Sequence, residues 1–195
     1  MKYEQLKREL INLGFADESE LEEFGTIVTD AINRAITEIN LTVAPIIGTY
    51  EIEQDGTEED IMYYNMPSLT QNNGVVDFLE FADTPVKIGT GVYRKFSDYE
   101  IESGDTLVID GRLVGTFKVF YKKAHTPITE ETPNDTELEL PLKAHVLVPL
   151  LAAYYIWLED EKSKAVDYYN QYEKLSQYIL SESHKPRMTI LSGGI

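Results

Sequence analysis

Apolar residues near the start of the chain recur with the 3.6-residue period of an amphipathic helix. The first stripe stops at Gly14, a residue type that commonly follows a helix end, and it comprises Tyr3, Leu6, Leu10 and Leu13. A second stripe begins after a capping Asp17 or Ser19, ends before Pro45, and comprises Leu21, Phe24, Val28, Ile32, Ala35 and Ile39. These stripes predict two helices within residues 1–44 that pack as an antiparallel hairpin.

The period changes from 3.6 to 2 after residue 45, and short runs of β-branched and aromatic residues alternate with turn residues up to residue 123. We expect strands over residues 47–53, 61–64, 75–81, 86–88, 99–102, 106–109 and 113–121. The Asp110-Gly111 pair predicts a tight hairpin between the last two strands. In the final strand, the alternation places Phe117, Val119 and Tyr121 on one face.

The rest of the chain predicts a connector, a helix pair and a terminal arm. Residues 124–140 are rich in Thr, Pro, Glu, Asp and Asn, which indicates an extended surface connector. Helical periodicity covers residues 141–181, with a break expected in the polar run 159–164. The expected core positions of these helices are Leu147, Leu151, Tyr154, Leu158, Tyr168 and Tyr172. Residues 182–195 form an arm whose apolar part is Met188, Thr189, Ile190 and Leu191.

These elements predict an α+β fold. The N-terminal helical hairpin (1–44) and the C-terminal helix pair (141–181) would form a small bundle, with an antiparallel β-domain (45–123) inserted between them. The connector, residues 124–140, would lead back from the β-domain to the bundle, and the C-terminal helices would pack on residues 1–44.

The composition excludes some classes of function but does not identify one. The 195-residue chain has 17 Lys and Arg against 34 Asp and Glu, a net charge of −17, and no cysteine. So negative a chain disfavours sequence-independent nucleic-acid binding, which requires clustered basic residues. No apolar stretch is long enough to cross a bilayer, and no secretory signal is expected.

No recognisable catalytic, cofactor or metal motif occurs in the sequence. The three histidines lie at unrelated positions, and the acidic run 53–60 lacks the ligand spacing of a calcium loop. We therefore expect neither an enzyme nor a bound cofactor. One alternative is a binding module whose β-domain recognises a carbohydrate or a host protein through its aromatic residues, namely Tyr50, Tyr63, Tyr64, Phe78, Phe81, Tyr93 and Tyr99.

The order of the parts resembles the head-to-tail connector proteins of tailed bacteriophages. Two segments carry most of the resemblance: residues 140–155, LPLKAHVLVPLLAAYY, and residues 164–173, KAVDYYNQYE. Both look like the two-helix core of these adaptors. The strand GTFKVFY at 115–121 and the following Pro127-Ile128-Thr129 are similar to the family in the same setting. The central β-region is longer than in the smallest family members.

The resemblance implies a structural virion protein made in the cytoplasm of an infected bacterium and located in the neck of the virion. About twelve copies would form a ring that docks on the portal protein, lines the DNA exit channel and offers a platform to a neck or tail protein. DNA would be a passing strand, and no membrane would be involved. The charge is compatible with this role, since residues 44–140 carry 19 acidic and 7 basic residues and an acidic wall does not hold phosphates. The apolar arm is expected to add to a sheet edge or groove, favouring a neighbouring subunit.

Overall fold

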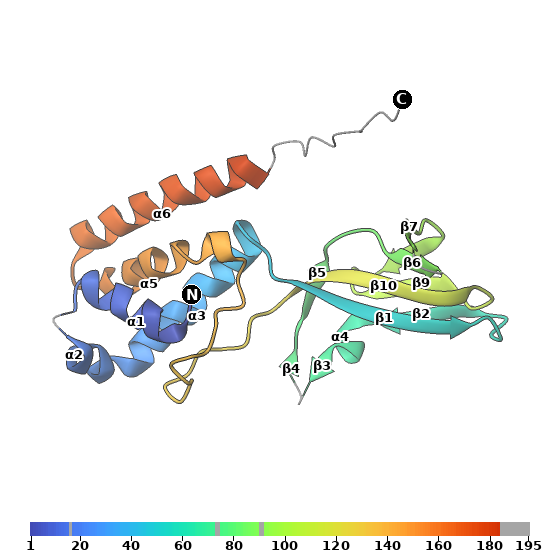
Figure 1. Ribbon diagram of the computed structural model, residues 1–195, viewed down its shortest axis with the longest axis horizontal. Helices are drawn as coiled ribbons and strands as arrows, with labels where there is room; N and C mark the ends of the chain where they lie inside the picture. Colours follow the sequence, from blue (N-terminus) through green and yellow to red (C-terminus); the bar gives the residue numbers. More distant parts are fainter. Residues whose placement is uncertain (16, 73–74, 90–91, 184–195) are drawn as a thin grey trace, which may run out of the picture. The chain divides into compact units, whose positions relative to one another are not determined.

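The computed structural model describes residues 1–15, 17–72, 75–89 and 92–183, and it is a mixture of helices and antiparallel sheets (Figure 1). The chain divides into two compact units. The helical unit combines Met1–Ala44 with the chain from Pro127 onward, and the β unit is Pro45–Thr126. The predicted α+β class is therefore confirmed, with helices from both parts of the chain enclosing the inserted β region in sequence.

The centre of the helical unit is a helix that is apolar on all sides. This helix, α5 (Leu147–Trp157), has the sequence LVPLLAAYYIW. It packs against α1 (Tyr3–Asn12), α3 (Gly25–Thr42) and α6 (Lys162–Ser183). A helix without a polar face is stable in water only when neighbours cover it, so α5 is the core around which the unit assembles.

The prediction of a single second helix after Gly14 is wrong, because the structure has α2 (Glu18–Glu23) and α3 separated at Phe24. Asp17 caps α2 as expected, its carboxylate accepting a hydrogen bond from the backbone N–H of Glu20 at 3.0 Å. Phe24 has non-helical angles (φ −97°, ψ 18°), and its ring centroid lies 6.0 Å from that of Phe15. Gly25, a poor helix former, follows directly. Aromatic packing and a weak helix former together explain the break.

The polar run at 159–164 does interrupt the C-terminal helices, as the sequence predicted. The helix α5 ends at Trp157 and α6 begins at Lys162. At the break, the Trp157 ring lies 5.3 Å from the ring of Phe15 and 3.6 Å from the ammonium of Lys164. A short 3₁₀ helix, η1 (Leu142–Ala144), precedes α5 and contacts α6.

The connector is held to the bundle by paired backbone and side-chain hydrogen bonds. The amide of Asn33 in α3 donates to the Ile128 carbonyl and accepts from the Ile128 N–H, both at 2.8 Å. Near the end of the connector, Lys2 and Glu137 form an isolated antiparallel β-bridge. The connector also buries Ile128, Leu138 and Leu140, so these few apolar residues act as its anchors.

The β unit contains two main antiparallel sheets. The larger has the order β1 (Ile47–Asp55), β10 (Val114–Lys123), β6 (Val86–Gly89) and β7 (Val92–Lys95), with β5 (Phe78–Phe81) also paired to β10. The smaller has the order β2 (Ile61–Asn65), β9 (Thr106–Asp110) and β8 (Tyr99–Glu102). A helical turn, α4 (Met66–Leu69), and the two-residue strands β3 (Gln71–Asn72) and β4 (Val75–Val76) complete the unit.

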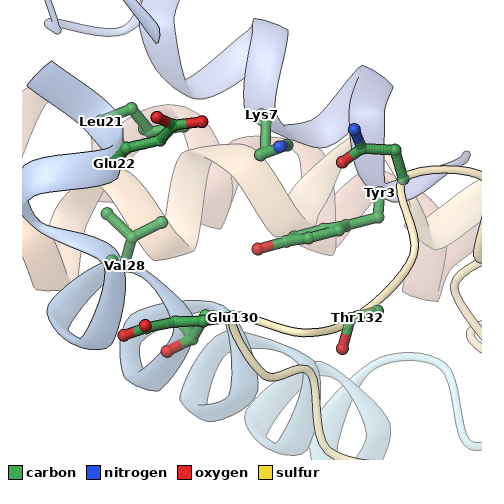
Figure 2. Close-up of a pocket in the computed structure, with 10 residues that line it drawn as sticks. Tyr3, Lys7, Leu21, Glu22, Val28, Glu130 and Thr132 are labelled. Atoms are coloured by element: carbon green, nitrogen blue, oxygen red, sulfur yellow. The ribbon is translucent and has the colours of Figure 1, made fainter. Parts of the chain in front are cut away.

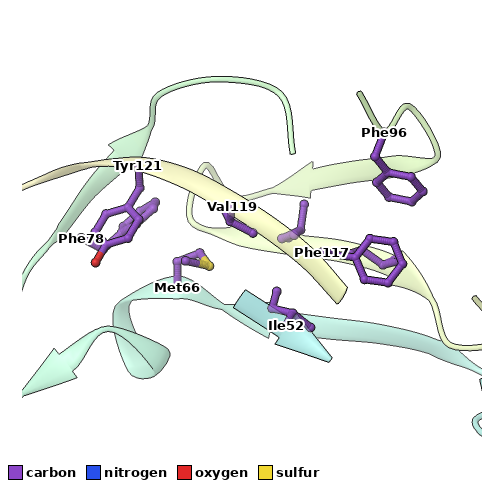
Figure 3. Packing of buried hydrophobic residues seen from close by; sticks show 9 residues of the cluster. Ile52, Met66, Phe78, Phe96, Phe117, Val119 and Tyr121 are labelled. Carbon is purple, nitrogen blue, oxygen red and sulfur yellow. The ribbon is translucent and has the colours of Figure 1, made fainter. Parts of the chain in front are cut away.

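Side chains from both sheets build one aromatic and aliphatic core (Figure 3). The predicted inward face of the last strand is confirmed, since Phe117, Val119 and Tyr121 of β10 are all buried. The other buried members come from several elements and are Ile52, Met66, Phe78, Phe96, Leu107 and Ile109. The unit is therefore a two-layer structure in which β9 and β10 contribute to opposite layers.

The predicted hairpin between the last two strands is wrong. Asp110 and Gly111 do form a turn, closed by a 3.1 Å hydrogen bond from Leu113 N–H to the Asp110 carbonyl. However, β9 pairs with β2 and β8, whereas β10 pairs with β1, β5 and β6. The Gly111 N–H donates instead to the Asp60 carbonyl at 3.0 Å, just before β2. The turn thus carries the chain from one layer to the other, because a two-layer core buries more apolar surface than a single ribbon.

Two smaller differences concern the middle of the β unit. The predicted strand 75–81 is divided into β4 and β5 at Asp77, whose carbonyl accepts from Ala124 N–H at 2.7 Å and whose carboxylate accepts from the Tyr121 hydroxyl at 3.3 Å. These partners draw Asp77 out of a continuous ladder. The strand β7 was not predicted, because its four residues are too few for a clear period.

Candidate interaction surface

The predicted helix-core positions divide into two groups. Leu147, Leu151 and Tyr172 are buried, whereas Tyr154, Leu158 and Tyr168 are half-buried. The predicted arm residues Met188, Thr189, Ile190 and Leu191 lie outside the described residues.

The aromatic side chains of tyrosines in α5 and α6 pack against one another within the helical bundle. Ring centroids of Tyr154 and Tyr169 are 4.9 Å apart, and those of Tyr169 and Tyr172 are 5.8 Å apart. The hydroxyl of Tyr155 donates to the carboxylate of Glu38 in α3, and burial raises the pKa of Tyr155. These contacts join α5 and α6 to each other and to α3, so the cluster serves packing between helices.

A small pocket with a mixed polar and apolar lining lies between α1, α2, the start of α3 and the connector, with a volume of 240 Å³. Figure 2 shows Tyr3 and Lys7 on the α1 side and Glu130 and Thr132 on the connector side. Two of its charged groups have partners within the unit: the Lys7 ammonium lies 3.9 Å from Glu18, and a Glu130 carboxylate oxygen accepts from the Thr26 hydroxyl at 2.7 Å. Burial, followed by the nearby charge of Glu130, raises the pKa of Tyr3. The pocket therefore links α1 and α3 to the connector through internal contacts.

A larger and more apolar groove lies between α1 and the start of α5, with a volume of 580 Å³. Leu142, Val146 and Leu150 follow one another at i, i+4 spacing along one wall. Glu9 and Leu13 come from the α1 side. Leu142 is 79% exposed and Val146 is 47% exposed. We call this set of residues the α1–α5 groove.

His145 fixes the floor of the α1–α5 groove. Its Nε2 lies 2.7 Å from the Leu140 carbonyl, an acceptor only, so Nε2 carries the proton and donates. Its Nδ1 then accepts from the amine of Met1 at 2.5 Å. Burial lowers the pKa of His145, which favours this neutral tautomer. A neutral His145 with both nitrogens bonded links the N-terminus, the connector and η1 beneath the exposed Leu142 and Val146.

The acidic loop of the β unit is organised by its own hydrogen bonds. Asp55 accepts from the backbone N–H of Thr57 at 3.0 Å and from the Thr57 hydroxyl at 2.7 Å, and these bonds lower the pKa of Asp55. In the turn that follows β9, hydrogen bonds from Arg112 lower the pKa of Asp110 to about 2. Within the described ranges, no group of three His, Asp or Glu side chains is placed to hold a metal ion.

The aromatic residues proposed as a β-domain binding face are mostly used inside the unit. Phe78 belongs to the core, and Tyr50, Tyr64, Phe81 and Tyr99 pack against it. Only Tyr63 among the six with described side chains is largely exposed, at 59%. The side chain of Tyr93 lies outside the described part of the chain.

The α1–α5 groove was missed by the sequence reasoning. The apolar residues of 141–181 were treated as a single core stripe that includes Leu147 and Leu151, so a second apolar face was not considered. The i, i+4 spacing of Leu142, Val146 and Leu150 was the available signal.

No model of a known protein family matches the chain, and no curated protein matches it. None of the helices, over the residues described, has the length and apolar character needed to span a membrane.

Proposed function

We propose that this chain is a ring-forming head-to-tail connector of a tailed bacteriophage. About twelve copies assemble on the portal protein, line the DNA exit channel, and present a platform to the next neck or tail protein. The chain acts in the neck of the virion, with DNA as a passing strand.

The arrangement of the helical unit is the observation that carries this proposal. The two segments that resemble the connector family, residues 140–155 and 164–173, lie in η1, α5 and α6. There they make the buried helix α5 and its partner α6, and α1 and α3 from the other end of the sequence complete the bundle. A helix pair enclosed in this way fits the two-helix core that the resemblance implies.

Exposed apolar side chains give the helical unit a surface suited to self-association. In the α1–α5 groove, the side chains of Leu142 and Val146 are 79% and 47% exposed, and Leu150 continues the same line. Single exposed apolar residues are ordinary, but grouping of several along one groove is typical of surfaces that bind protein. This favours an assembling subunit over a freely diffusing monomer.

The acidic charge supports a channel through which DNA slides. A wall of carboxylates does not neutralise phosphates, so it neither retains the strand nor releases counterions. In the β unit, the basic side chains of Lys118 and Lys122 already form ion pairs, with Glu51 and Glu80. Their charge is therefore partly compensated within the sheet.

Native mass spectrometry and electron microscopy of the purified chain test the proposal. A discrete high-order ring is expected, alone or upon addition of the portal protein. A chain that stays monomeric in both conditions contradicts it.

Salt dependence supplies a second test, because about twelve copies of a −17 chain repel one another as a ring closes. Screening acts beyond the Debye length of about 8 Å at physiological ionic strength, so lower salt is expected to weaken assembly and magnesium or added salt to restore it. A DNA-binding protein shows the opposite sign, with DNA affinity rising as salt falls. Tight DNA retention at low salt with no oligomer at any salt contradicts the connector proposal.

The alternative binding module retains one supporting observation, the exposed Tyr63 beside Ile61 on β2 of the smaller sheet. A carbohydrate or host-protein site there predicts a monomer or dimer. Glycan-array binding that is lost in Tyr63→Ala would favour it over the connector.

A further inference from the structure

The α1–α5 groove leaves Leu142 and Val146 open to solvent, although the groove has the size of a ligand-binding site. Its 580 Å³ lies within the range of roughly 300–1,000 Å³ that is usual for such sites. Leu142 and Val146 stand one helical turn apart at its edge, and Leu150 continues the same line. The groove therefore fits a short segment with two or three apolar side chains.

The sequence after α6 has the composition of such a segment. The twelve residues that follow Ser183 have the sequence HKPRMTILSGGI, with Met188, Ile190 and Leu191 as large apolar residues. They carry Lys185 and Arg187 but no acid, so all 34 acidic residues lie elsewhere in the chain. The segment is basic and apolar, and the groove is lined mainly by apolar side chains, with Glu9 in its wall and the Met1 amine already bonded to His145.

The direction of α6 favours a groove on another copy. α6 has 22 residues and α5 has 11, which correspond to about 33 and 16 Å of helix. The two helices run antiparallel after a four-residue connection, and α6 contacts η1, so its second half extends beyond the start of α5. The groove runs the opposite way, from Leu142 back along α5 to Leu150.

A return to the same groove requires a sharp reversal directly after α6. Pro186 follows α6 by three positions, and the sequence has no glycine between Ser183 and Met188. A fully extended chain of twelve residues spans about 40 Å, more than the roughly 16 Å length of α5.

We propose that the α1–α5 groove of one copy binds Met188, Thr189, Ile190 and Leu191 of the neighbouring copy. This inference rests on the proposed ring. The contact joins two different surfaces and repeats identically on every copy, as a closed heterologous ring requires. Leu142 and Val146 are covered by the apolar residues, and Lys185 and Arg187 face the acidic surface of the neighbour.

A cysteine pair tests the contact directly, because the chain has no cysteine of its own. Val146→Cys with Ile190→Cys is expected to give, on mild oxidation, a ladder of covalent multimers in a non-reducing gel. The matched control is Val166→Cys with Ile190→Cys, since Val166 is 50% exposed but lies on α6 outside the groove. A disulfide within one chain, or a ladder no stronger than the control, overturns the proposal.

Substitution and truncation separate this proposal from the ring itself. Removal of residues 184–195, or Leu142→Asp, is expected to reduce the ring population at least tenfold, whereas Leu41→Asp, at a site 52% exposed and outside the groove, leaves it unchanged. Circular dichroism checks that each variant is folded. A fluorescent peptide of residues 184–195 is expected to bind the truncated chain and to lose binding in Leu142→Asp. Rings that survive both changes overturn the groove contact alone, while an unaltered chain that never forms a ring overturns the proposed function.

Discussion

Three leucine-to-alanine substitutions in the helical unit test whether α5 is its core. Leu151 is completely buried in α5, Leu158 is half-buried just after α5, and Leu142 in η1 is 79% exposed. Each substitution removes the same atoms, so the differences in unfolding free energy depend on burial and on the cavity left behind.

The expected losses follow from those exposures. Leu151→Ala removes a fully enclosed side chain and is expected to cost about 4 kcal/mol, within the 2–5 kcal/mol range of buried leucines. The Leu158 side chain is already partly solvated, so Leu158→Ala is expected to lower the unfolding free energy by only about 2 kcal/mol. Leu142→Ala is expected to change the unfolding free energy by less than about 0.5 kcal/mol, as surface substitutions do.

Urea unfolding followed by tryptophan fluorescence reads out this unit selectively. Trp157 is the chain's single tryptophan, and it contacts Phe15 and Lys164 within the helical unit. With a slope of about 1.5 kcal/mol per molar urea, the Leu151→Ala midpoint is expected to fall by about 2.7 M. Equal shifts for Leu151→Ala and Leu142→Ala, or an unmoved midpoint for Leu151→Ala, would refute the central position of α5.

Three further predictions concern single contacts. Gly111→Ala is expected to destabilise the β unit by about 3 kcal/mol in thermal unfolding, because its Cβ would lie 2.6 Å from the Asp60 carbonyl that its own N–H binds. Asn33→Asp is expected to cost about 2 kcal/mol in urea, since a carboxylate cannot donate to the Ile128 carbonyl. Burial and the nearby Asp77 raise the pKa of Tyr121 to about 12, above its unfolded value of 10. Tyr121 therefore contributes fully to the free energy of unfolding below pH 10, and this contribution is lost between pH 10 and 12. Unfolding measured at each pH checks this.

Matched variants identify the cause in each case. Gly104→Ala, at φ +81° with nothing within 4 Å, is expected to cost only about 1 kcal/mol, so a larger loss there than at Gly111 would contradict the steric argument. Asn33→Ala should be about as harmful as Asn33→Asp, and a neutral result for both would mean that the connector is held by other contacts. Tyr121→Phe should reduce the decrease in unfolding free energy above pH 10. If unfolding free energy falls as steeply with pH in this variant, Tyr121 does not contribute to the alkaline loss.

The parts of the fold that follow from local pattern were predictable. The helical period and Gly14 located α1, and the polar run at 159–164 located the end of α5 and the start of α6. Period-two alternation identified the buried face of β10. In each case the signal lies within one element and its immediate neighbours, so a single sequence contains it.

The pairing of strands was not predictable because it depends on distant residues. Asp110-Gly111 has the local chemistry of a hairpin, yet Gly111 donates to Asp60, fifty-one positions earlier. The first strand of the unit pairs with the last, Ile52 opposite Phe117. Local turn chemistry specifies that the chain turns, and the burial of Phe117 and Leu107 from opposite layers decides where it goes.

The candidate surface depends on a distinction that periodicity does not make. Leu147 and Leu150 are about one helical turn apart, so periodicity assigns them to one stripe. However, α5 has α1, α3 and α6 as neighbours, so apolar residues on several of its faces make contacts within the unit. For such a helix, the informative residues are those left uncovered, and these are Leu142 and Val146, which are 79% and 47% exposed. If a second copy supplies the missing cover, then the residues that stabilise the monomer and those that build the assembly are adjacent on one helix. Substitutions at Leu151 and Leu142 should then separate completely, the first acting on unfolding and the second on oligomer mass.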